Sequence, residues 1–279
     1  MPHQHPRANL KALPRQAVRG GSGPGVTPNM EVRMTKQEVL TILKQDYNLL
    51  TAKGYEVFGV FLFGSQNYGL DRETSDIDVK VIYTKAPDEQ YKVFFRHEPS
   101  GQITPLSIDS FLSSLENGYH TWCELLFTDF YYVPYKFCRI WNRVLLERDK
   151  YICENKKVII DREVEYINSQ IDYLKKHDAK NVSQANKRLS YLYRSLFMID
   201  SLLNNLTYAE ALRPTEDIYD IIMDLKINKP LVFEECCDQA LLIKNKIVTM
   251  IQQANCPVVC NLNSLSKISS LLQSTISNN

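Results

Sequence analysis

Hydrophobic residues recur at helical and then at strand spacing near the start of the ordered part of the chain, and they predict a helix followed by a strand. Thr35 is the expected N-cap of a helix over residues 36–50, with Glu38 at the capping-box position. Tyr55–Phe63 is rich in β-branched and aromatic residues, which is typical of a buried strand. The helix has an apolar face made of Val39, Ile42, Leu43, Tyr47 and Leu50.

Shorter elements are expected to follow. After a turn-rich stretch, Asp76–Tyr83 reads as a second strand, and residues 84–102 resemble a loop. Residues 103–108 predict a third strand that leads into a helix from about Asp109 to Asn117. This first part of the chain therefore mixes strands with helices.

Beyond residue 150 the pattern is helical. Pro214 precedes a helix with acids in its first turn, a last long helix is expected from about Leu231 to Ala254, and the Ser/Asn-rich end is expected to fray. The fold class predicted is α+β, with a catalytic domain at residues 30–150 and a helical, substrate-binding domain at 151–279. Helical spacing is shown by Val164, Ile167, Ile171 and Leu174, and again by Leu189, Leu192, Leu196, Ile199 and Leu203.

Residues 1–29 differ in composition from the rest. They hold five prolines, four glycines and four basic residues but no acid, so they cannot bury enough apolar surface to fold. We expect a disordered extension. Its origin stays open between a transit peptide, a native extension and sequence that precedes a true start at Met30 or Met34.

Overall composition indicates a soluble, cytoplasmic protein. The 33 Lys and Arg nearly balance the 32 Asp and Glu, which argues against a protein that coats nucleic acid. The longest apolar stretch, Val57–Phe63, is far shorter than the roughly 20 residues of a membrane helix. Seven irregularly spaced cysteines indicate reduced thiols. The alternative is a zinc site made of Cys236, Cys237, Cys256 and Cys260.

The candidate chemistry lies at the junction between the first two strands. A strand that ends at Gly64-Ser65 gives an anionic group access to backbone N–H donors and to a hydroxyl, as a phosphate site requires. Asp76 and Asp78 are two residues apart in the next strand, so their carboxylates share a face with Lys80. Paired carboxylates favour a bound Mg²⁺ or Mn²⁺, and Lys80 is a candidate contact for a carboxylate or a phosphate.

The segment from Phe63 to Lys80 resembles the signature of the DNA polymerase β-like nucleotidyltransferase superfamily, in which Gly-Ser is followed after about ten residues by Asp-x-Asp. It is most similar to a subgroup of predicted bacterial and phage nucleotidyltransferases, which Gly118 and the stretch Glu124–Thr128 also resemble. The resemblance implies a mixed β-sheet flanked by helices. It further implies that Gly64 and Ser65 hold the phosphates of a nucleoside triphosphate (NTP) and that Asp76 and Asp78 bind two divalent ions.

A third carboxylate is implied by the resemblance but is not obvious in this sequence. Such enzymes place it on a neighbouring strand, where it binds the metal nearest the attacking hydroxyl. Asp109 is the only acid available as a catalytic and metal-binding residue, although the alignment of motifs places the position nearer Thr104. Asp109 is alternatively a helix N-cap, and Glu124 reads as a structural salt-bridge partner.

A basic stripe in the helical region is a second clue. Six Lys or Arg and one acid lie between residues 175 and 194, and Lys187, Tyr191 and Arg194 share one helical stripe. The stripe is either a site for triphosphate or acceptor phosphates or a solvated basic face.

The leading hypothesis is a metal-dependent nucleotidyltransferase that transfers a nucleoside monophosphate from an NTP to an acceptor hydroxyl and releases pyrophosphate. The acceptor is open between an RNA end, a protein and a small molecule, and so is the oligomeric state. Two alternatives remain. One is an inactive relative that binds nucleotide, RNA or a partner protein, and the other is an antitoxin-type nucleotidyltransferase that modifies its partner.

Overall fold

The computed structural model describes residues 34–70, 75–87, 93–96, 99–177, 181–254 and 263–277. The expected extension at 1–29 and the cysteines Cys256 and Cys260 lie outside these ranges. Within them, no helix is both long enough and apolar enough to cross a membrane.

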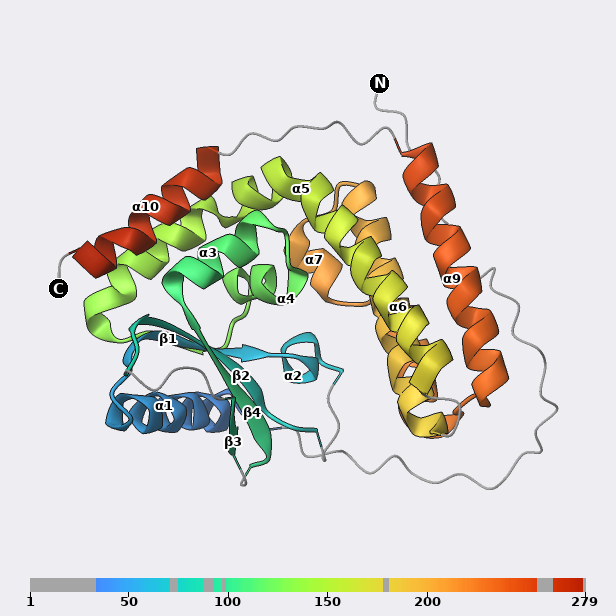
Figure 1. Ribbon diagram of the computed structural model, residues 1–279, viewed down its shortest axis with the longest axis horizontal. Coiled ribbons are helices and arrows are strands. Elements are labelled where there is room, and N and C mark those ends of the chain that lie inside the picture. Colours follow the sequence, from blue (N-terminus) through green and yellow to red (C-terminus); the bar gives the residue numbers. More distant parts are fainter. Residues whose placement is uncertain are drawn as a thin grey trace.

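A mixed five-stranded sheet forms the first part of the molecule, in the order β3-β4-β2-β1-β5 (Figure 1). β2 pairs antiparallel with β1 but parallel with β4, and the short strands β3 and β5 form the two edges. Because β2 and β4 run in the same direction, both strands begin at the same edge of the sheet. The strands are β1 (Glu56–Phe63), β2 (Asp78–Lys85), β3 (Phe94–Arg96), β4 (Gly101–Ser107) and β5 (Tyr131–Tyr132).

Helices cover both faces of the sheet and then continue as a helical region. Figure 1 shows α1 on one face and α3, α4 and α5 on the other, with α6 and α9 further from the sheet. The helices that contact the sheet or follow it directly are α1 (Lys36–Ala52), α2 (Ser65–Tyr68), α3 (Ile108–Glu116), α4 (His120–Cys123), the 3₁₀ turn η2 (Glu124–Leu126) and α5 (Tyr135–His177). The later ones are α6 (Val182–Leu203), α7 (Tyr208–Leu212), α8 (Glu216–Met223), the π-helical turn η3 (Asp224–Asn228), α9 (Phe233–Gln253) and α10 (Asn263–Ser277).

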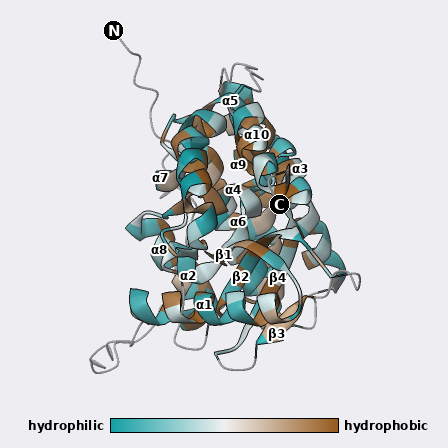
Figure 2. Ribbon diagram, turned by 90° about the vertical axis from the view of Figure 1, so that its left-hand side faces the viewer, coloured by the Kyte–Doolittle hydropathy of each residue, from teal (hydrophilic) through white to brown (hydrophobic). Residues whose placement is uncertain are grey.

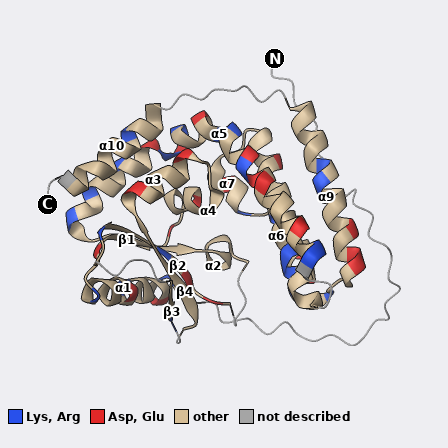
Figure 3. Cartoon of the chain, viewed as in Figure 1, with Lys and Arg blue, Asp and Glu red and all other residues tan. Residues whose placement is uncertain are grey.

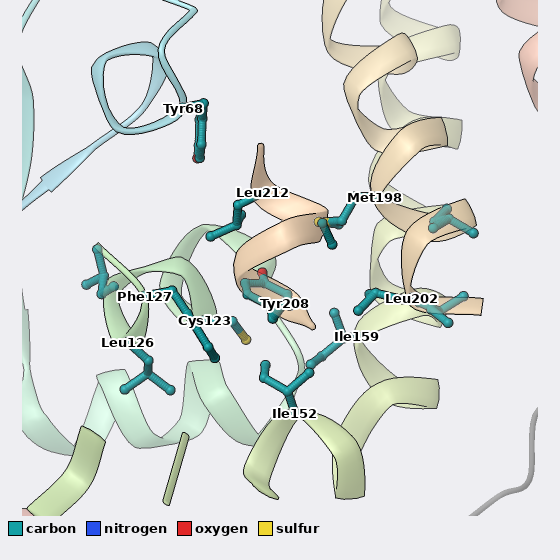
Figure 4. Packing of buried hydrophobic residues seen from close by; sticks show 14 of the residues in the cluster. Tyr68, Cys123, Leu126, Phe127, Ile152, Ile159, Met198, Leu202, Tyr208 and Leu212 are labelled. Atoms are coloured by element: carbon teal, nitrogen blue, oxygen red, sulfur yellow. The ribbon is translucent and has the colours of Figure 1, made fainter. Parts of the chain in front are cut away.

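Two apolar cores hold these layers together. The smaller one joins α1 to one face of the sheet, and the ribbon of α1 alternates between hydrophilic and hydrophobic residues (Figure 2). The larger core begins on the other face and continues without a break through α5, α6 and α9 to α10. In its interior, the ring centroids of Phe127 and Tyr208 lie 5.0 Å apart, beside Cys123 (Figure 4). The helical region is thus packed onto the sheet.

Most elements with a clear hydrophobic period form as predicted. The first helix has its capping box, with the Thr35 hydroxyl accepting from the Glu38 N–H and the Glu38 carboxylate accepting from the Thr35 N–H. β1 and α3 are confirmed, but β2 begins at Asp78, so that Asp76 lies just before the strand. The expected domain boundary at residues 150 and 151 falls inside the 43-residue helix α5.

Two expectations were wrong. Part of the loop expected over residues 84–102 is β3, whose three residues are too few to show a period and which depends on pairing with β4. Residues 263–277 of the Ser/Asn-rich end do not fray but form α10. Its apolar residues at helical spacing, Leu265, Ile268 and Leu272, are buried in the larger core, which stabilises a helix of low intrinsic propensity.

A Leu→Ala pair tests the packing of α10. Leu272 in α10 is fully buried, so Leu272→Ala is expected to lower the free energy of unfolding by about 2–5 kcal/mol. Leu146 in α5 is 82 % exposed, and Leu146→Ala is expected to change it by no more than about 0.5 kcal/mol. Denaturant unfolding of both variants measures the difference. Equal effects would show that α10 is not part of the core.

Candidate functional site

The candidate site lies at the sheet edge where β1 ends and where β2 and β4 begin. β1 ends at Phe63, which pairs with Asp78 at the start of β2. Gly64 then turns the chain into α2 with φ of +85° and ψ of −154°, a conformation available essentially to glycine alone. A Cβ atom on Gly64 would lie 3.7 Å from Oδ2 of Asp78, so the glycine backbone and this carboxylate are neighbours.

The two aspartates are held by the segment that leads into β4. The Ser100 hydroxyl donates to Oδ1 of Asp76 at 2.5 Å, and the Gln102 N–H donates to Oδ1 of Asp78 at 3.0 Å. Asp76 is exposed and Asp78 is half-buried. Each carboxylate therefore has one oxygen fixed by the protein.

Charge repulsion between the aspartates contributes to the raised pKa of Asp78. Burial raises the pKa of Asp78, and the negative charge of Asp76 raises it further. The Gln102 N–H and the positive charges of Lys187 and Arg96 lower it in part. The pair thus costs free energy that a bound cation would offset.

Helix α6 supplies positive charge to this edge. Lys187 is exposed and acts electrostatically on Asp78, which places this part of the predicted basic stripe opposite the aspartates. Tyr191, one helical turn further along, is half-buried. Figure 3 shows the basic residues gathered where α5 ends and α6 begins.

The third member of the stripe, Arg194, is directed to the rear of the Gly64 turn. Its guanidinium lies 3.5 Å from the ring centroid of Tyr68 in α2, and its Nη2 atom lies 3.5 Å from Oε2 of Glu124. Glu124 is fully buried; it also accepts from the Tyr68 hydroxyl and, at 3.4 Å, from the Gly64 N–H. The prediction that Glu124 is a structural salt-bridge partner is confirmed. The N–H of Gly64 points to this carboxylate.

Lys80 is not brought to the aspartates. Its ammonium lies 4.0 Å from the ring centroids of both Phe63 and Trp122 and donates to the Thr121 carbonyl. Burial holds the pKa of Lys80 well below its usual range. The expected contact with a carboxylate or phosphate is therefore replaced by an interior position, because two aromatic rings and a carbonyl attract the cation inward.

Asp109 is also not brought to the site. It lies in the first turn of α3, directly after β4, whereas Asp78 opens β2. Because β4 is parallel to β2 and Ser107 pairs with Tyr83, Asp109 follows the opposite end of the strand pair. The helix N-cap is Ser107, so the alternative role of Asp109 as N-cap is wrong as well.

The strand position beside the aspartates holds neutral side chains. Thr104 pairs with Lys80, which places Thr104 and Gln102 on the face that Asp78 and Lys80 share. The Gln102 amide donates to the Thr104 hydroxyl at 3.2 Å. The family resemblance places a third carboxylate near Thr104, so this strand position holds a hydroxyl, with the Gln102 amide beside it.

Sequence reasoning missed Ser100, Gln102 and Arg96 as neighbours of the aspartates. All three fall in residues 84–102, for which the sequence predicts a loop, and no local period identifies them. Only the parallel pairing of β4 with β2 brings this stretch beside Asp76 and Asp78.

A family model described as a nucleotidyltransferase domain matches residues 36–191. The chain belongs to this family. The matched part begins at the first residue of α1 and ends inside α6, so it contains the Gly64 turn, both aspartates and Lys187 of this nucleotidyltransferase. No curated protein matches the chain.

The two aspartates of the nucleotidyltransferase suit a hard cation whose remaining ligands are waters or phosphates. Asp76 and Asp78 supply carboxylate oxygens, and Mg²⁺ is commonly bound by one or two carboxylates together with waters and substrate phosphates. In the described parts of the chain, no cluster of three or more His, Cys, Asp or Glu has the arrangement of a metal site. The pair fits an ion shared with a phosphate, and it does not form a site complete in itself.

The buried carboxyl group of Glu124, behind the Gly64 turn, predicts how the stability of the protein depends on pH. Burial raises its pKa to about 8, although Arg194 and the Gly64 N–H favour the carboxylate; Glu163 on α5 acts in the same direction as burial. The folded protein then binds a proton that the unfolded chain releases near pH 4.5. The stability that this protonated group contributes is therefore lost as pH rises from about 4.5 to 8, by at most about 1.4 kcal/mol per pH unit.

Denaturant unfolding at several pH values between 5 and 8 measures this effect against Glu124→Gln, which keeps the shape but cannot ionise. The free energy of unfolding is expected to fall more steeply with pH in the wild type. Parallel pH profiles would show that Glu124 stays charged.

Proposed function

We propose that this nucleotidyltransferase transfers a nucleoside monophosphate from an NTP to an acceptor hydroxyl and releases pyrophosphate, with Mg²⁺ or Mn²⁺ held by Asp76 and Asp78. The observation that carries the proposal is the meeting of the Gly64 turn with the two aspartates at one sheet edge. A phosphate chain beside the turn would lie within reach of both carboxylates.

The protein groups proposed to bind the triphosphate come from two elements. Ser65 follows the glycine turn, and its hydroxyl and N–H are donors suited to phosphate oxygens. Lys187 on α6 faces the same edge and would pair with the triphosphate charge. Arg194 acts from behind, since its contacts with Tyr68 and Glu124 fix α2 and thereby the turn.

When bound, the divalent ion would neutralise charge on the reacting phosphate. The work of the chain is to keep the carboxylates in place while they repel each other. Ser100 and Gln102 do so by fixing one oxygen of each aspartate. The acceptor is proposed to approach from the side of α6, where the basic residues gather (Figure 3).

One observation favours a second candidate function. The Thr104 hydroxyl, bonded to the Gln102 amide, stands where the family resemblance implies a third carboxylate. A chain with this arrangement would bind the nucleotide through Asp76, Asp78 and Ser65 without transferring it. Nucleotide binding without pyrophosphate release would support this alternative.

The aspartates carry the first functional prediction. Asp76→Asn and Asp78→Asn each remove a charged metal ligand and are expected to reduce pyrophosphate release by about 10²–10³-fold, the usual cost of removing one such electrostatic contact. The measurement is pyrophosphate release from each of the four NTPs with Mg²⁺ or Mn²⁺, with cellular RNA or lysate as acceptor.

Asp161→Asn is the control for that experiment, because this aspartate lies on α5 and pairs with Lys157. It is expected to keep wild-type activity. Full activity in both active-site variants would contradict the proposed transfer.

Asp109 is a catalytic residue in the sequence-based prediction, whereas the structure places it away from the site, and a substitution distinguishes the two. Asp109 is exposed at the other end of the strand pair, so Asp109→Asn is expected to change pyrophosphate release by less than about twofold, as for a surface substitution. The same release assay measures it. A loss comparable to that of Asp78→Asn would show that Asp109 takes part in catalysis.

A further inference from the structure

Arg96 makes four hydrogen bonds, which link α1 and Pro99 to the aspartate segment, residues 76–78. From β3, its Nε and Nη2 atoms donate to the two carboxylate oxygens of Asp46 in α1, at 3.0 and 2.9 Å. Nη2 also donates to the carbonyl of Ile77 at 2.9 Å, and Nη1 donates to the carbonyl of Pro99 at 2.9 Å. Ile77 is the residue between Asp76 and Asp78.

Residues 99–102, which follow Arg96 in the chain, supply the other polar contacts of residues 76–78. The Ile77 N–H donates to the Ser100 carbonyl at 2.8 Å, while the Ser100 hydroxyl and the Gln102 N–H bind Asp76 and Asp78. A Cβ on Gly101 would overlap the Ile77 carbonyl and would lie 3.0 Å from Nη1 of Arg96. Residues 76–78 are therefore packed on one side against Arg96 and residues 99–102, and at Gly101 there is no room for a side chain.

The ion pair with Asp46 fixes the orientation of the Arg96 guanidinium, and so its bonds to the Pro99 and Ile77 carbonyls. Asp46 is 2 % exposed, and the Arg96 side chain is 10 % exposed. A guanidinium that binds a carboxylate with two parallel bonds has a fixed plane, so its remaining N–H groups have fixed directions. Figure 1 shows α1 lying across the sheet close to β3, the arrangement that lets Asp46 reach Arg96.

We propose that Asp46 and Arg96 are positioning residues of the metal site: the pair sets the Ile77 carbonyl and so fixes the direction and separation of the Asp76 and Asp78 carboxylates. The inference rests on the proposed function, because it assigns these residues to the metal that the aspartates are proposed to hold. Both residues would act through the Ile77 backbone and not as ligands of the ion. Outer-shell groups of this kind typically change metal affinity by about 10–100-fold.

The Asp46–Arg96 pair could serve only to hold α1 on the sheet. A substitution at Leu50 distinguishes that role from positioning of the aspartates. Leu50 is fully buried in the core that joins α1 to the same sheet face. Leu50→Ala loosens that docking but removes none of the hydrogen bonds of Arg96. Arg96→Lys keeps the positive charge but cannot make the paired bonds, and Asp46→Asn keeps the volume of the side chain.

The experiment is Mn²⁺ binding, followed by the electron paramagnetic resonance signal of the free ion, with the thermal midpoint recorded for every variant. Arg96→Lys is expected to weaken Mn²⁺ binding by about tenfold or more, and Asp46→Asn in the same direction. Leu50→Ala is expected to bind Mn²⁺ like the wild type despite a lower thermal midpoint. Asp46→Asn decides the matter if Arg96→Lys does not fold.

Wild-type Mn²⁺ affinity in folded Arg96→Lys or Asp46→Asn would overturn the inference and leave the proposed function intact. An equal loss in Leu50→Ala would overturn it too, because docking of α1 would then explain the effect. If the wild type binds no more Mn²⁺ than Asp76→Asn/Asp78→Asn, the metal part of the proposed function fails, and the inference fails with it.

Discussion

Repulsion between two carboxylates at one sheet edge is the interaction on which the rest of the site depends. Asp76 raises the pKa of a half-buried Asp78, so the pair keeps its geometry only while the surrounding groups hold it. Those groups are the Ser100 hydroxyl just before β4 and the Gln102 N–H in β4, and they lie beside the aspartates because β4 runs parallel to β2. The direction of one strand thus determines which residues can support the site.

The helical region contributes to this edge through packing as well as charge. The larger core runs unbroken from the sheet through α5 and α6, so the position of α6 relative to β1 and β2 is set by buried apolar contacts. That position places Lys187 opposite Asp78, and it places Arg194 against Tyr68 and Glu124 behind the Gly64 turn. A basic stripe that reads as one surface in the sequence therefore performs two different tasks, one facing the site and one inside the protein.

Features that depend only on residues near one another in the chain could be predicted from the sequence. The capping box, the buried strand β1, the Gly64 turn and the Asp76–Asp78 spacing are all legible within a few residues. The roles expected of Lys80 and Asp109 failed because they depend on contacts between distant segments. Two aromatic rings attract Lys80 inward, and strand direction sends Asp109 to the far end. β3 and its Arg96 lie in a segment with no period at all.

The neutral pair Gln102 and Thr104 follows the same electrostatic logic. A third carboxylate on this face would add repulsion at Asp78, whose pKa the negative charge of Asp76 already raises. With an amide and a hydroxyl there, the positive charges of Lys187 and Arg96 oppose two negative charges before any ion binds. Such an edge is suited to an ion that arrives with its phosphates, because each partner brings charge that the other neutralises. Under the proposed function, this edge would bind a free ion and would bind a metal–nucleotide complex more tightly.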